Sequence, residues 1–427
     1  MAIEEDVIVI GGGIAGSIAA LSAADTGAQV RLVTHKKSTL RHASGLIDVL
    51  GYTDGESGPV HDPFTSLDGL PEEHPYSLVG ESAIRGGLEI FDTVTDGAYS
   101  GAHTDQNALV TTSGGAIKPT ARYPTSAAAG LVSDDRPMLI VGFRSLTDFN
   151  GELVADHLAA AGVPFEVNGA EIEVPGNYRA DARVTRIANA LDLNKDLSYN
   201  GRTLPARDAF AEAIKPHLGT ADRVGVPALL GDDHADDVRA DLERSLGVAV
   251  FEIPMGPPSY PGLRLEDLLF DALDDAGVRI SDGNPAVGYE TTADGDTLES
   301  ITIDRRGREI PYHAEQFILA TGGLVGKGIS SDRNGVYEPV FNCYVPHSDD
   351  RYQWFSEDAF GEHPFATFGV PINEHCQPLT AEGKTEFSNL RAAGGVIGGV
   401  DPTAEKSKSG VSLATGYAAG REAGEAI

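Results

Sequence analysis

The sequence predicts an α/β fold whose main domain is assembled from two separate parts of the chain, with a second α/β domain inserted between them. Three observations lead to this prediction. A strand pattern at the N-terminus runs into a G-x-G-x-x-G motif formed by Gly11, Gly13 and Gly16. A second glycine turn, Thr321-Gly322-Gly323, follows a late strand, and a third glycine-rich unit precedes the last helix. Turns at both ends of the chain must meet in space if they serve one ligand.

The N-terminal elements set the fold class. A strand at Val7 to Ile10 leads into the glycine motif and a small-residue helix, and a second strand follows at Val30 to Val33. In this order the glycines let the backbone approach a phosphate, and the helix N-terminus points its free N–H groups at the anion. The unit predicts a Rossmann-like FAD/NAD(P)-binding fold, which the flanking elements favour over an ordinary tight turn.

The end of the second strand departs from the dinucleotide pattern. Such strands usually end on Asp or Glu, which binds the ribose of adenosine. Here the position is Thr34, followed by His35. A cofactor without an adenosine ribose would not need this carboxylate.

The middle of the chain alternates between strand and helix patterns. An apolar strand at residues 137–143 is followed by a predicted helix with Ser145 as its N-cap. The alternation predicts an inserted βα-rich domain at residues 85–256. Residues 1–84 and 257–427 then form the discontinuous flavin-binding domain, which includes antiparallel strands within residues 278–312.

The three glycine-rich turns resemble those of flavoproteins with two dinucleotide-binding domains, of the fumarate reductase type. The resemblance implies that the last helix, beginning near Gly410, directs its N-terminus at the flavin pyrimidine oxygen. The donors would be the N–H groups of Gly410, Val411 and Ser412. Thr321 and Gly322 would also line the flavin. A polar loop at Ser44 and Gly45 would run along the ring, with His42 beside it.

A narrower resemblance rests on several motifs together, namely HASGLIDVL, HPYSLVG, GFRSLTDFN, PPSYPGLRL, SDRNGVYEPVF and GGVIGGVDP. They are similar to the B subunit of the anaerobic glycerol-3-phosphate dehydrogenase family, from residue 6 to about residue 420. The resemblance implies FMN as the cofactor, with FAD as the alternative, and Thr34 at the end of the second strand favours FMN because FMN has no adenosine ribose. It also implies a catalytic FAD subunit and an iron–sulfur membrane-anchor subunit as partners, and glycerol 3-phosphate as substrate.

The sequence leaves the catalytic residues open. His42, Arg264 and Arg333 are weak candidates, and Arg264 and Arg333 could equally form buried ion pairs. Cys343 and Cys376 have no C-x-x-C partner and are predicted to be core thiols. No clustered metal-ligand motif occurs, so we expect no metal site.

The net charge limits the possible partners. The formal charge of −32 comes from 64 acidic and 32 basic residues. The acids are spread along the chain, which favours a surface adapted to high salt over an acidic binding tail. Nucleic-acid binding, which needs basic patches, is not expected.

The predicted function is a flavin-containing subunit of a glycerol-3-phosphate:quinone oxidoreductase that passes electrons toward iron–sulfur centres. The alternatives are a stand-alone flavoprotein acting on another small organic substrate and a flavin-less scaffold subunit. With no spanning segment and no room for a signal peptide before the first strand, the sequence predicts a cytoplasmic protein held at the membrane through its partners. The segment DDRYQWFSEDAF and the inserted domain are the predicted docking faces.

Overall fold

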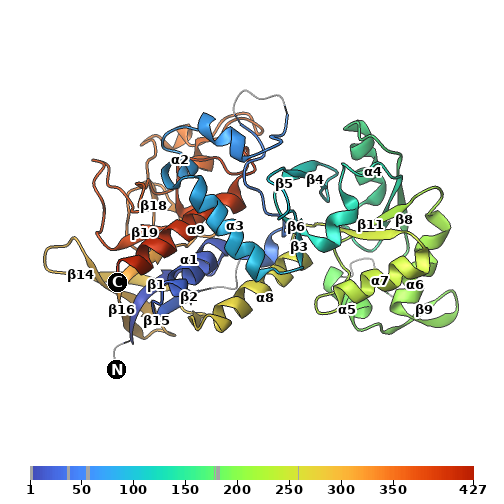
Figure 1. The fold of residues 1–427 in the computed structure, drawn as a ribbon, viewed down its shortest axis with the longest axis horizontal. Helices are drawn as coiled ribbons and strands as arrows, with labels where there is room; N and C mark the ends of the chain where they lie inside the picture. The colour runs from blue at the N-terminus through green and yellow to red at the C-terminus, as the bar shows by residue number, and fades with distance from the viewer. Residues whose placement is uncertain (1–2, 36–38, 54–57, 177, 179–182, 258) are drawn as a thin grey trace. The chain divides into compact units, whose positions relative to one another are not determined.

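The chain forms two compact units in the computed structural model, which describes residues 3–35, 39–53, 58–176, 178, 183–257 and 259–427 (Figure 1). Unit 1 comprises residues 1–39, 48–96 and 267–427, and unit 2 comprises residues 40–47 and 97–266. The chain passes from unit 1 to unit 2 between residues 96 and 97, and it returns to unit 1 between residues 266 and 267. Both points lie later in the chain than the predicted boundaries at 84/85 and 256/257. That division into domains stays a prediction.

Unit 1 is built on a seven-stranded sheet. Its order is β13 (Arg279–Asp282), β2 (Val30–Thr34), β1 (Ile3–Ile10), β16 (Glu309–Leu319), β15 (Leu298–Asp304) and β14 (Ala286–Thr291), and β19 (Leu390–Ala392) also pairs with β16. The strands β13, β2, β1, β16 and β19 pair in parallel, whereas β14, β15 and β16 form an antiparallel meander. The carboxyl ends of the parallel strands therefore share one edge of the sheet, where the glycine turns begin.

The first and last long helices of the chain lie side by side in unit 1. Figure 1 shows α1 (Ile14–Asp25) beside α9 (Lys408–Glu425), with α3 (Glu81–Val94) also packed on α9. The short helix α2 (Pro75–Val79) precedes α3. Ten residues of α9 are buried, so this helix is covered by protein on several sides rather than along one stripe.

Small residues allow α1 and α9 to approach closely. A Cβ atom on Gly416 would stand 2.6 Å from the carbonyl oxygen of Ala15, and one on Gly420 would stand 2.3 Å from that of Ala19. Gly424 repeats the pattern one turn later, where a Cβ would stand 2.2 Å from Oγ1 of Thr26. The spacing of four residues puts the three glycines on one face of α9. Backbone packs directly on backbone along this face.

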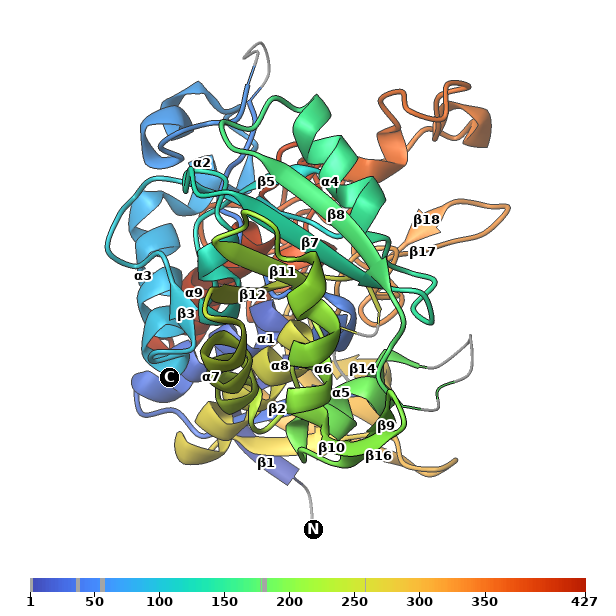
Figure 2. The same cartoon turned by 90° about the vertical axis from the view of Figure 1, so that its right-hand side faces the viewer.

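Unit 2 contains a four-stranded parallel sheet in the order β12 (Ala249–Ile253), β11 (Arg223–Pro227), β7 (Met138–Phe143) and β8 (Val167–Ile172) (Figure 2). Leu139, Val141 and Phe143 pack with the helices α5 (Val184–Asp192), α6 (Ala206–Ile214) and α7 (Ala235–Leu246). Met138 and Ile140 pack on the other side with α4 (Gly151–Ala160). Burial of both faces explains the uninterrupted apolar run of β7.

The remaining strands form small antiparallel pairs. In unit 2 these are β3 (Tyr99–Ser100) with β6 (Tyr123–Pro124), β4 (Ala108–Thr111) with β5 (Ile117–Thr120), and β9 (Asp196–Tyr199) with β10 (Arg202–Pro205). In unit 1, β17 (Ser330–Ser331) pairs with β18 (Val336–Tyr337). The helix α8 (Tyr260–Asp275) begins in unit 2 and ends in unit 1.

The α/β fold class and its discontinuous assembly are confirmed, but one predicted helix start was wrong. α4 begins at Gly151 rather than after Ser145, because the side chain of Asn150 caps it by accepting a hydrogen bond from the N–H of Leu153 at 2.7 Å. Asn and Ser are comparable N-caps, so the sequence alone did not distinguish them.

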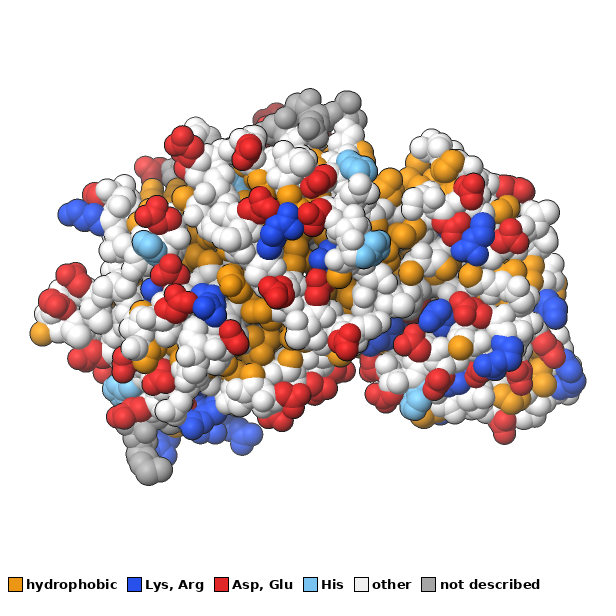
Figure 3. Space-filling model, in the orientation of Figure 1, with side chains coloured by type: hydrophobic (Ala, Val, Ile, Leu, Met, Phe, Trp, Pro, Cys, Tyr) orange, Lys and Arg blue, Asp and Glu red, His pale blue; other side chains and the backbone are white. Residues whose placement is uncertain are grey.

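The surface carries the acidic residues as the sequence predicts. Figure 3 shows acidic side chains spread over the visible face of each unit instead of gathered in one tract. Among the described residues, every helix is too short or too polar to span a bilayer.

The packing of α1 on α9 predicts an unusual response to a conservative substitution. Gly→Ala inside a helix normally adds stability, because alanine has the higher helix propensity. Gly420→Ala should instead destabilise unit 1 by about 1–3 kcal/mol, since the new methyl group would overlap the carbonyl oxygen of Ala19. Denaturant unfolding in molar KCl would measure the change.

Gly69→Ala is the matched control for this substitution. A Cβ at Gly69 meets no atom within 4 Å, and its backbone is free of the left-handed strain that would penalise alanine. The free energy of unfolding should change little there. Equal or greater stability of Gly420→Ala would contradict the described packing.

Candidate functional site

The three glycines of the motif between β1 and α1 have different surroundings. Gly11 has a φ of +123°, and a Cβ on it would lie 2.1 Å from the carbonyl oxygen of Ala320. A Cβ on Gly16 would lie 1.8 Å from the carbonyl oxygen of Gly11. Both glycines are therefore required by the protein's own packing. Gly13 differs, because a Cβ on it would meet no atom of the described residues within 4 Å.

The open space at Gly13 fits a phosphate group. Gly13 is the N-cap residue of α1, and no side chain caps this helix among the described residues. The N–H groups of the first turn thus face the place where a side chain at position 13 would stand. An anionic phosphate binds well at a helix N-terminus that has no side-chain cap and that lies beside a glycine with open space.

The residue at the end of β2 packs beneath this turn. Thr34 is buried, and a Cβ on Gly12 would lie 3.0 Å from both the Cβ and the Oγ1 of Thr34. The position usually held by a ribose-binding carboxylate is therefore filled by a small side chain against the glycine turn. The neighbouring strand β13 ends at Asp282, which is paired in register with Thr34 and is exposed.

The second and third glycine turns meet beside the first. The segment after β16 approaches the segment after β19, because a Cβ on Gly323 would lie 2.7 Å from the carbonyl oxygen of Gly395. Gly394 has a φ of +73°, and a Cβ on it would lie 2.5 Å from the Cβ of Ala15 and 3.3 Å from the Oγ of Ser412. The turns at residues 11–16, 320–323 and 394–396, here called the glycine cradle, thus converge at the carboxyl edge of the sheet.

Thr321 and Gly322, both predicted cofactor ligands, lie in this cradle. Gly322 has a φ of +81°, which favours glycine at this turn. The Oγ1 atom of Thr321 is buried, and in the described residues it makes no hydrogen bond. A buried hydroxyl group without a partner is uncommon in a folded protein, so this atom marks a place where a ligand atom could complete the bonding.

The first N–H groups of α9 already have hydrogen-bond partners within the protein. The N–H of Ser409 donates to Oδ1 of Asp48 at 3.0 Å, and the N–H of Gly410 donates to the carbonyl oxygen of Asp48 at 2.6 Å. The N–H of Val411 donates to the carbonyl oxygen of Ser407 at 2.9 Å. The hydroxyl of Ser412 donates to the carbonyl of Lys408 at 2.9 Å.

These contacts give the predicted flavin donors partners within the protein, and flavin binding by this helix stays a prediction. The N–H groups of Gly410 and Val411, expected to face the flavin, are used inside the protein. The physical reason is the buried carboxylate of Asp48, which occupies the positive end of the α9 dipole. Gly410 is needed there because a Cβ on it would lie 2.1 Å from the hydroxyl oxygen of Tyr76.

A buried polar cluster supports this cap, and sequence reasoning missed it. The hydroxyl of Tyr76 donates to the carbonyl of Val49 at 2.6 Å. The Nδ1 atom of His74 accepts from the N–H of Tyr76 at 3.0 Å, which leaves Nε2 to donate to Oε2 of Glu405 at 3.2 Å. Burial, followed by the charges of Asp48 and Glu405, raises the pKa of Tyr76 well above its ordinary value. Tyr76 is therefore a neutral structural donor.

The only local signal for this cluster was the His-Pro pair in the HPYSLVG motif. His74 is the N-cap of α2, and Pro75 occupies the first helical position, as is common at helix starts. The pattern indicated the start of a helix but not its buried partners, of which Val49 lies 27 positions away from Tyr76 and Glu405 lies 331 positions away from His74.

The predicted polar loop belongs to unit 2. His42 is exposed at the end of a 3₁₀ helix (Thr39–His42), and Ser44 accepts a hydrogen bond from the N–H of Leu46 at 3.4 Å. Gly45 is buried with a φ of +75°, and a Cβ on it would lie 2.6 Å from the Cβ of Pro261. Within unit 2, local packing explains Gly45. Flavin contacts by Ser44 and Gly45 stay a prediction.

Arg264 forms a buried ion pair in unit 2, which replaces the catalytic role considered for it. Its Nη1 and Nη2 atoms donate to Glu252 at 2.8 and 3.0 Å, and its Nε and Nη2 atoms donate to the carbonyl of Gly231 at 3.1 and 2.6 Å. Burial acts to raise the pKa of Glu252, but Arg264 and neighbouring donors outweigh it and lower the pKa. The pair is a fixed structural link.

Arg333 and the two cysteines, Cys343 and Cys376, lie in unit 1. Arg333 is exposed between β17 and β18, at the tip of their hairpin. Cys343 and Cys376 are buried free thiols, as predicted. Burial raises the pKa of Cys376 to about 12 and that of Cys343 further, so both thiols are unreactive at neutral pH.

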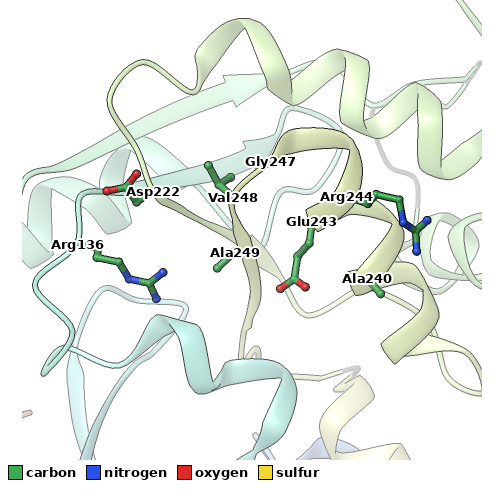
Figure 4. Close-up of a pocket in the computed structure, with 8 residues that line it drawn as sticks. All are labelled: Arg136, Asp222, Ala240, Glu243, Arg244, Gly247, Val248 and Ala249. Atoms are coloured by element: carbon green, nitrogen blue, oxygen red, sulfur yellow. The ribbon is translucent and has the colours of Figure 1, made fainter.

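Two other features of unit 2 resemble ligand sites but have structural explanations. Figure 4 shows a hollow of about 750 Å³ whose charged lining residues are Arg136, Asp222, Glu243 and Arg244. It lies at the amino ends of β11 and β12, whereas ligands of parallel sheets bind at the carboxyl ends. Both arginines are already paired, Arg136 with Asp134 and Arg244 with Asp241, each at 2.6 Å.

The second feature is a group formed by Asp192, Asp233 and His234, whose possible metal-ligand atoms lie within 4.8 Å of one another. Asp192 already accepts a hydrogen bond from the N–H of His234 at 2.8 Å, which accounts for part of this proximity. The absence of a metal site stays a prediction.

Comparisons with known proteins agree with the resemblance found in the sequence. Residues 6–411 match the family model described as FAD binding domain, which supports a flavin cofactor. A solved structure of 3-ketosteroid delta1-dehydrogenase from Sterolibacterium denitrificans has 11% identity and a TM-score of 0.47 over 99% of this chain and 100% of that chain. That likeness is too distant to bear on function.

Two curated relatives span nearly all of the chain. A Halobacterium salinarum protein, named as a probable B subunit of anaerobic glycerol-3-phosphate dehydrogenase, is 56% identical over 100% of this chain and 99% of its own length. A Vibrio cholerae protein, named as the B subunit of the same dehydrogenase, is 31% identical over 96% of this chain and 94% of its own length. The Halobacterium relative also fits the prediction of a surface adapted to high salt. The chain therefore belongs to the family of anaerobic glycerol-3-phosphate dehydrogenase B subunits.

Proposed function

We propose that this chain is a flavin-containing subunit of a glycerol-3-phosphate:quinone oxidoreductase and that it passes electrons toward iron–sulfur centres. The supporting observation is the convergence of three glycine turns at one sheet edge, in a chain whose relatives carry the name of this dehydrogenase. Oxidation of sn-glycerol 3-phosphate to dihydroxyacetone phosphate removes two electrons and two protons from the C2 alcohol. A bound flavin supplies the two-electron acceptor for such a step.

The residues of the chain favour electron relay over substrate oxidation. The glycine turn at residues 11–16 would hold the flavin phosphate with its N–H groups. The three weak catalytic candidates give little support to acid–base chemistry here, since Arg264 is bound to Glu252 while His42 and Arg333 are exposed. We therefore assign removal of the substrate protons to a partner subunit.

This division of labour predicts how the flavin responds to substrate. In molar KCl, glycerol 3-phosphate should leave the flavin absorbance of the isolated chain unchanged, and it should bleach that absorbance when the co-expressed partner subunits are present. Bleaching in the isolated chain would place substrate oxidation on this subunit. Reduction by another small organic substrate alone would favour a stand-alone dehydrogenase, and a flavin-free protein would favour a scaffold.

We propose FAD as the flavin, in place of the FMN favoured by Thr34, because the matched family is an FAD-binding one. Asp282 supplies the carboxylate that Thr34 lacks. It is paired in register with Thr34 on the adjacent parallel strand, so the two side chains leave the same face of the sheet. An exposed carboxylate one strand away could accept hydrogen bonds from the adenosine ribose.

Acid release of the bound flavin followed by chromatography tests this assignment. FAD should be recovered in stoichiometric amount, and Asp282→Asn should weaken FAD binding by roughly tenfold, which corresponds to about 1.4 kcal/mol. Binding of added FMN should not change, because FMN has no adenosine ribose. Recovery of FMN would instead support the prediction of FMN that is based on Thr34.

The space at Gly13 predicts a substitution that separates flavin binding from folding. Gly13→Val places its side chain where no protein atom lies within 4 Å, so we expect a cost of only about 0.5–1 kcal/mol from the weaker helix cap. Flavin affinity, measured by fluorescence titration of the apoprotein, should fall at least about tenfold.

Gly69→Val is the control for this substitution, since position 69 is also open and lies in unit 1. It should retain full flavin affinity. If Gly13→Val binds flavin normally, the phosphate does not lie over this turn.

We further propose that the chain acts beside a catalytic FAD subunit and an iron–sulfur membrane-anchor subunit, at the cytoplasmic face of the membrane. The relatives' designation as B subunits supports other subunits in the complex. The −32 charge disfavours direct contact with anionic lipid, so attachment would pass through a partner.

A further inference from the structure

Exposed aromatic side chains are concentrated in one short part of unit 1. Eleven large hydrophobic side chains are exposed among the described residues, and five of them lie within residues 344–365. These five, here called the aromatic surface, are Tyr344, Tyr352, Phe355, Phe360 and Phe365. A stretch of 22 residues in a chain of 427 would hold fewer than one of the eleven if they were evenly spread. The clustering therefore needs an explanation.

The base of this segment is firmly built. Trp354 is half-buried, and its Nε1 donates to the carbonyl of Ser348 at 2.7 Å. Its ring packs edge-to-face on His347 and Phe368, with ring centroids 5.8 and 6.1 Å apart. His347 in turn accepts a hydrogen bond from the N–H of Val336 at 3.2 Å through Nε2. The segment is thus anchored to unit 1, and Figure 2 draws it in orange, projecting from the body of that unit.

The tip of the segment presents Phe360 on an ordered loop. The side chain of Phe360 is 99% exposed, although its N–H donates to Oδ1 of Asp358 at 3.0 Å. The ring of His363 holds the loop from inside, because Nδ1 accepts from the N–H of Ser356 at 3.0 Å and Nε2 lies 3.3 Å from the carbonyl of Ala359. Because hydrogen bonds fix the loop that carries this ring, binding costs little backbone entropy there.

The charges around the aromatic surface restrict what can cover it. Five acidic residues and one arginine lie within residues 349–362, namely Asp349, Asp350, Glu357, Asp358, Glu362 and Arg351. All six side chains are exposed. A second copy of this chain docking by the same surface would bring carboxylates against carboxylates, and an anionic membrane would be repelled. A complementary surface carries Lys or Arg around an apolar pocket.

We propose that the aromatic surface docks another protein subunit of the same dehydrogenase complex, which receives Phe360 in an apolar pocket rimmed by cationic side chains. The inference rests on the proposed function for the existence of that complex. Fully exposed aromatic rings that enter a partner's pocket are typical binding hot spots. In molar salt the Debye length is only about 3 Å, so ring burial carries most of the affinity and the charges set the orientation.

Phe360→Ser tests the proposal, with the purified partner subunits as the probe in molar KCl. We expect affinity to fall roughly 30-fold, while the thermal stability and flavin content of the chain stay unchanged because the ring touches little of its own protein. Leu193→Ser, at a 55% exposed position in unit 2, is the matched control and should bind normally. Unchanged binding by Phe360→Ser would overturn the proposal.

Two further measurements separate the alternatives. A double variant that carries Glu357→Lys and Glu362→Lys tests the charge of the partner's surface. If that surface is cationic, the double variant should weaken binding more at low salt than at high salt, because salt screens the repulsion. If the isolated chain self-associates and Phe360→Ser abolishes this, the surface binds a second copy of the chain. If the chain floats with lipid vesicles and Phe360→Ser abolishes this, the surface binds lipid. If the complex assembles normally but binds no flavin, the proposed function is contradicted, whereas the proposed role of the aromatic surface in docking is not.

Discussion

The contact between α1 and α9 is the constraint on which unit 1 depends. Gly416 and Gly420 allow the last helix to lie against the carbonyl oxygens of Ala15 and Ala19, at separations that no larger residue permits. This contact fixes the position of the first turn of α9 relative to the first turn of α1. The turn at Gly394 fits between the two helices for the same reason. The glycine cradle is therefore a result of backbone packing and exists only when both ends of the chain are in place.

The cap on α9 gives the site an electrostatic character that the helix alone would not have. A free helix N-terminus attracts an anion, but here the carboxylate of Asp48 is already present and buried. In the described part of the chain, no side chain caps the N-terminus of α1. The two helices that approach the cradle thus differ in how their first N–H groups are bonded. The turn of Gly11 to Gly16 is for this reason the proposed phosphate site.

Local patterns predicted the elements that local physics determines. The glycine motif, the apolar strand β7 and the hairpin turns between β14, β15 and β16 depend on short-range spacing, and the structure contains them. The misplaced start of α4 reflects two comparable capping residues, Ser145 and Asn150, within one segment. Sequence order could not indicate that Arg264 pairs with Glu252 or that Asp48 caps α9. These partners are brought together only by tertiary packing, from as far as 361 residues apart.

The discontinuous build of unit 1 has a consequence for synthesis on the ribosome. Every residue of unit 2 has been translated once residue 266 is added, and this unit has its own hydrophobic core. Unit 1 lacks β16, β19 and α9 at that moment. At about 5–20 residues per second, the remaining residues take roughly 8–32 s to be made. During this interval β1, β2 and α1 can pack on one another but lack β16 and α9, on which they pack in the finished unit. The glycine cradle can form only once its second and third turns and the helix α9 have been made.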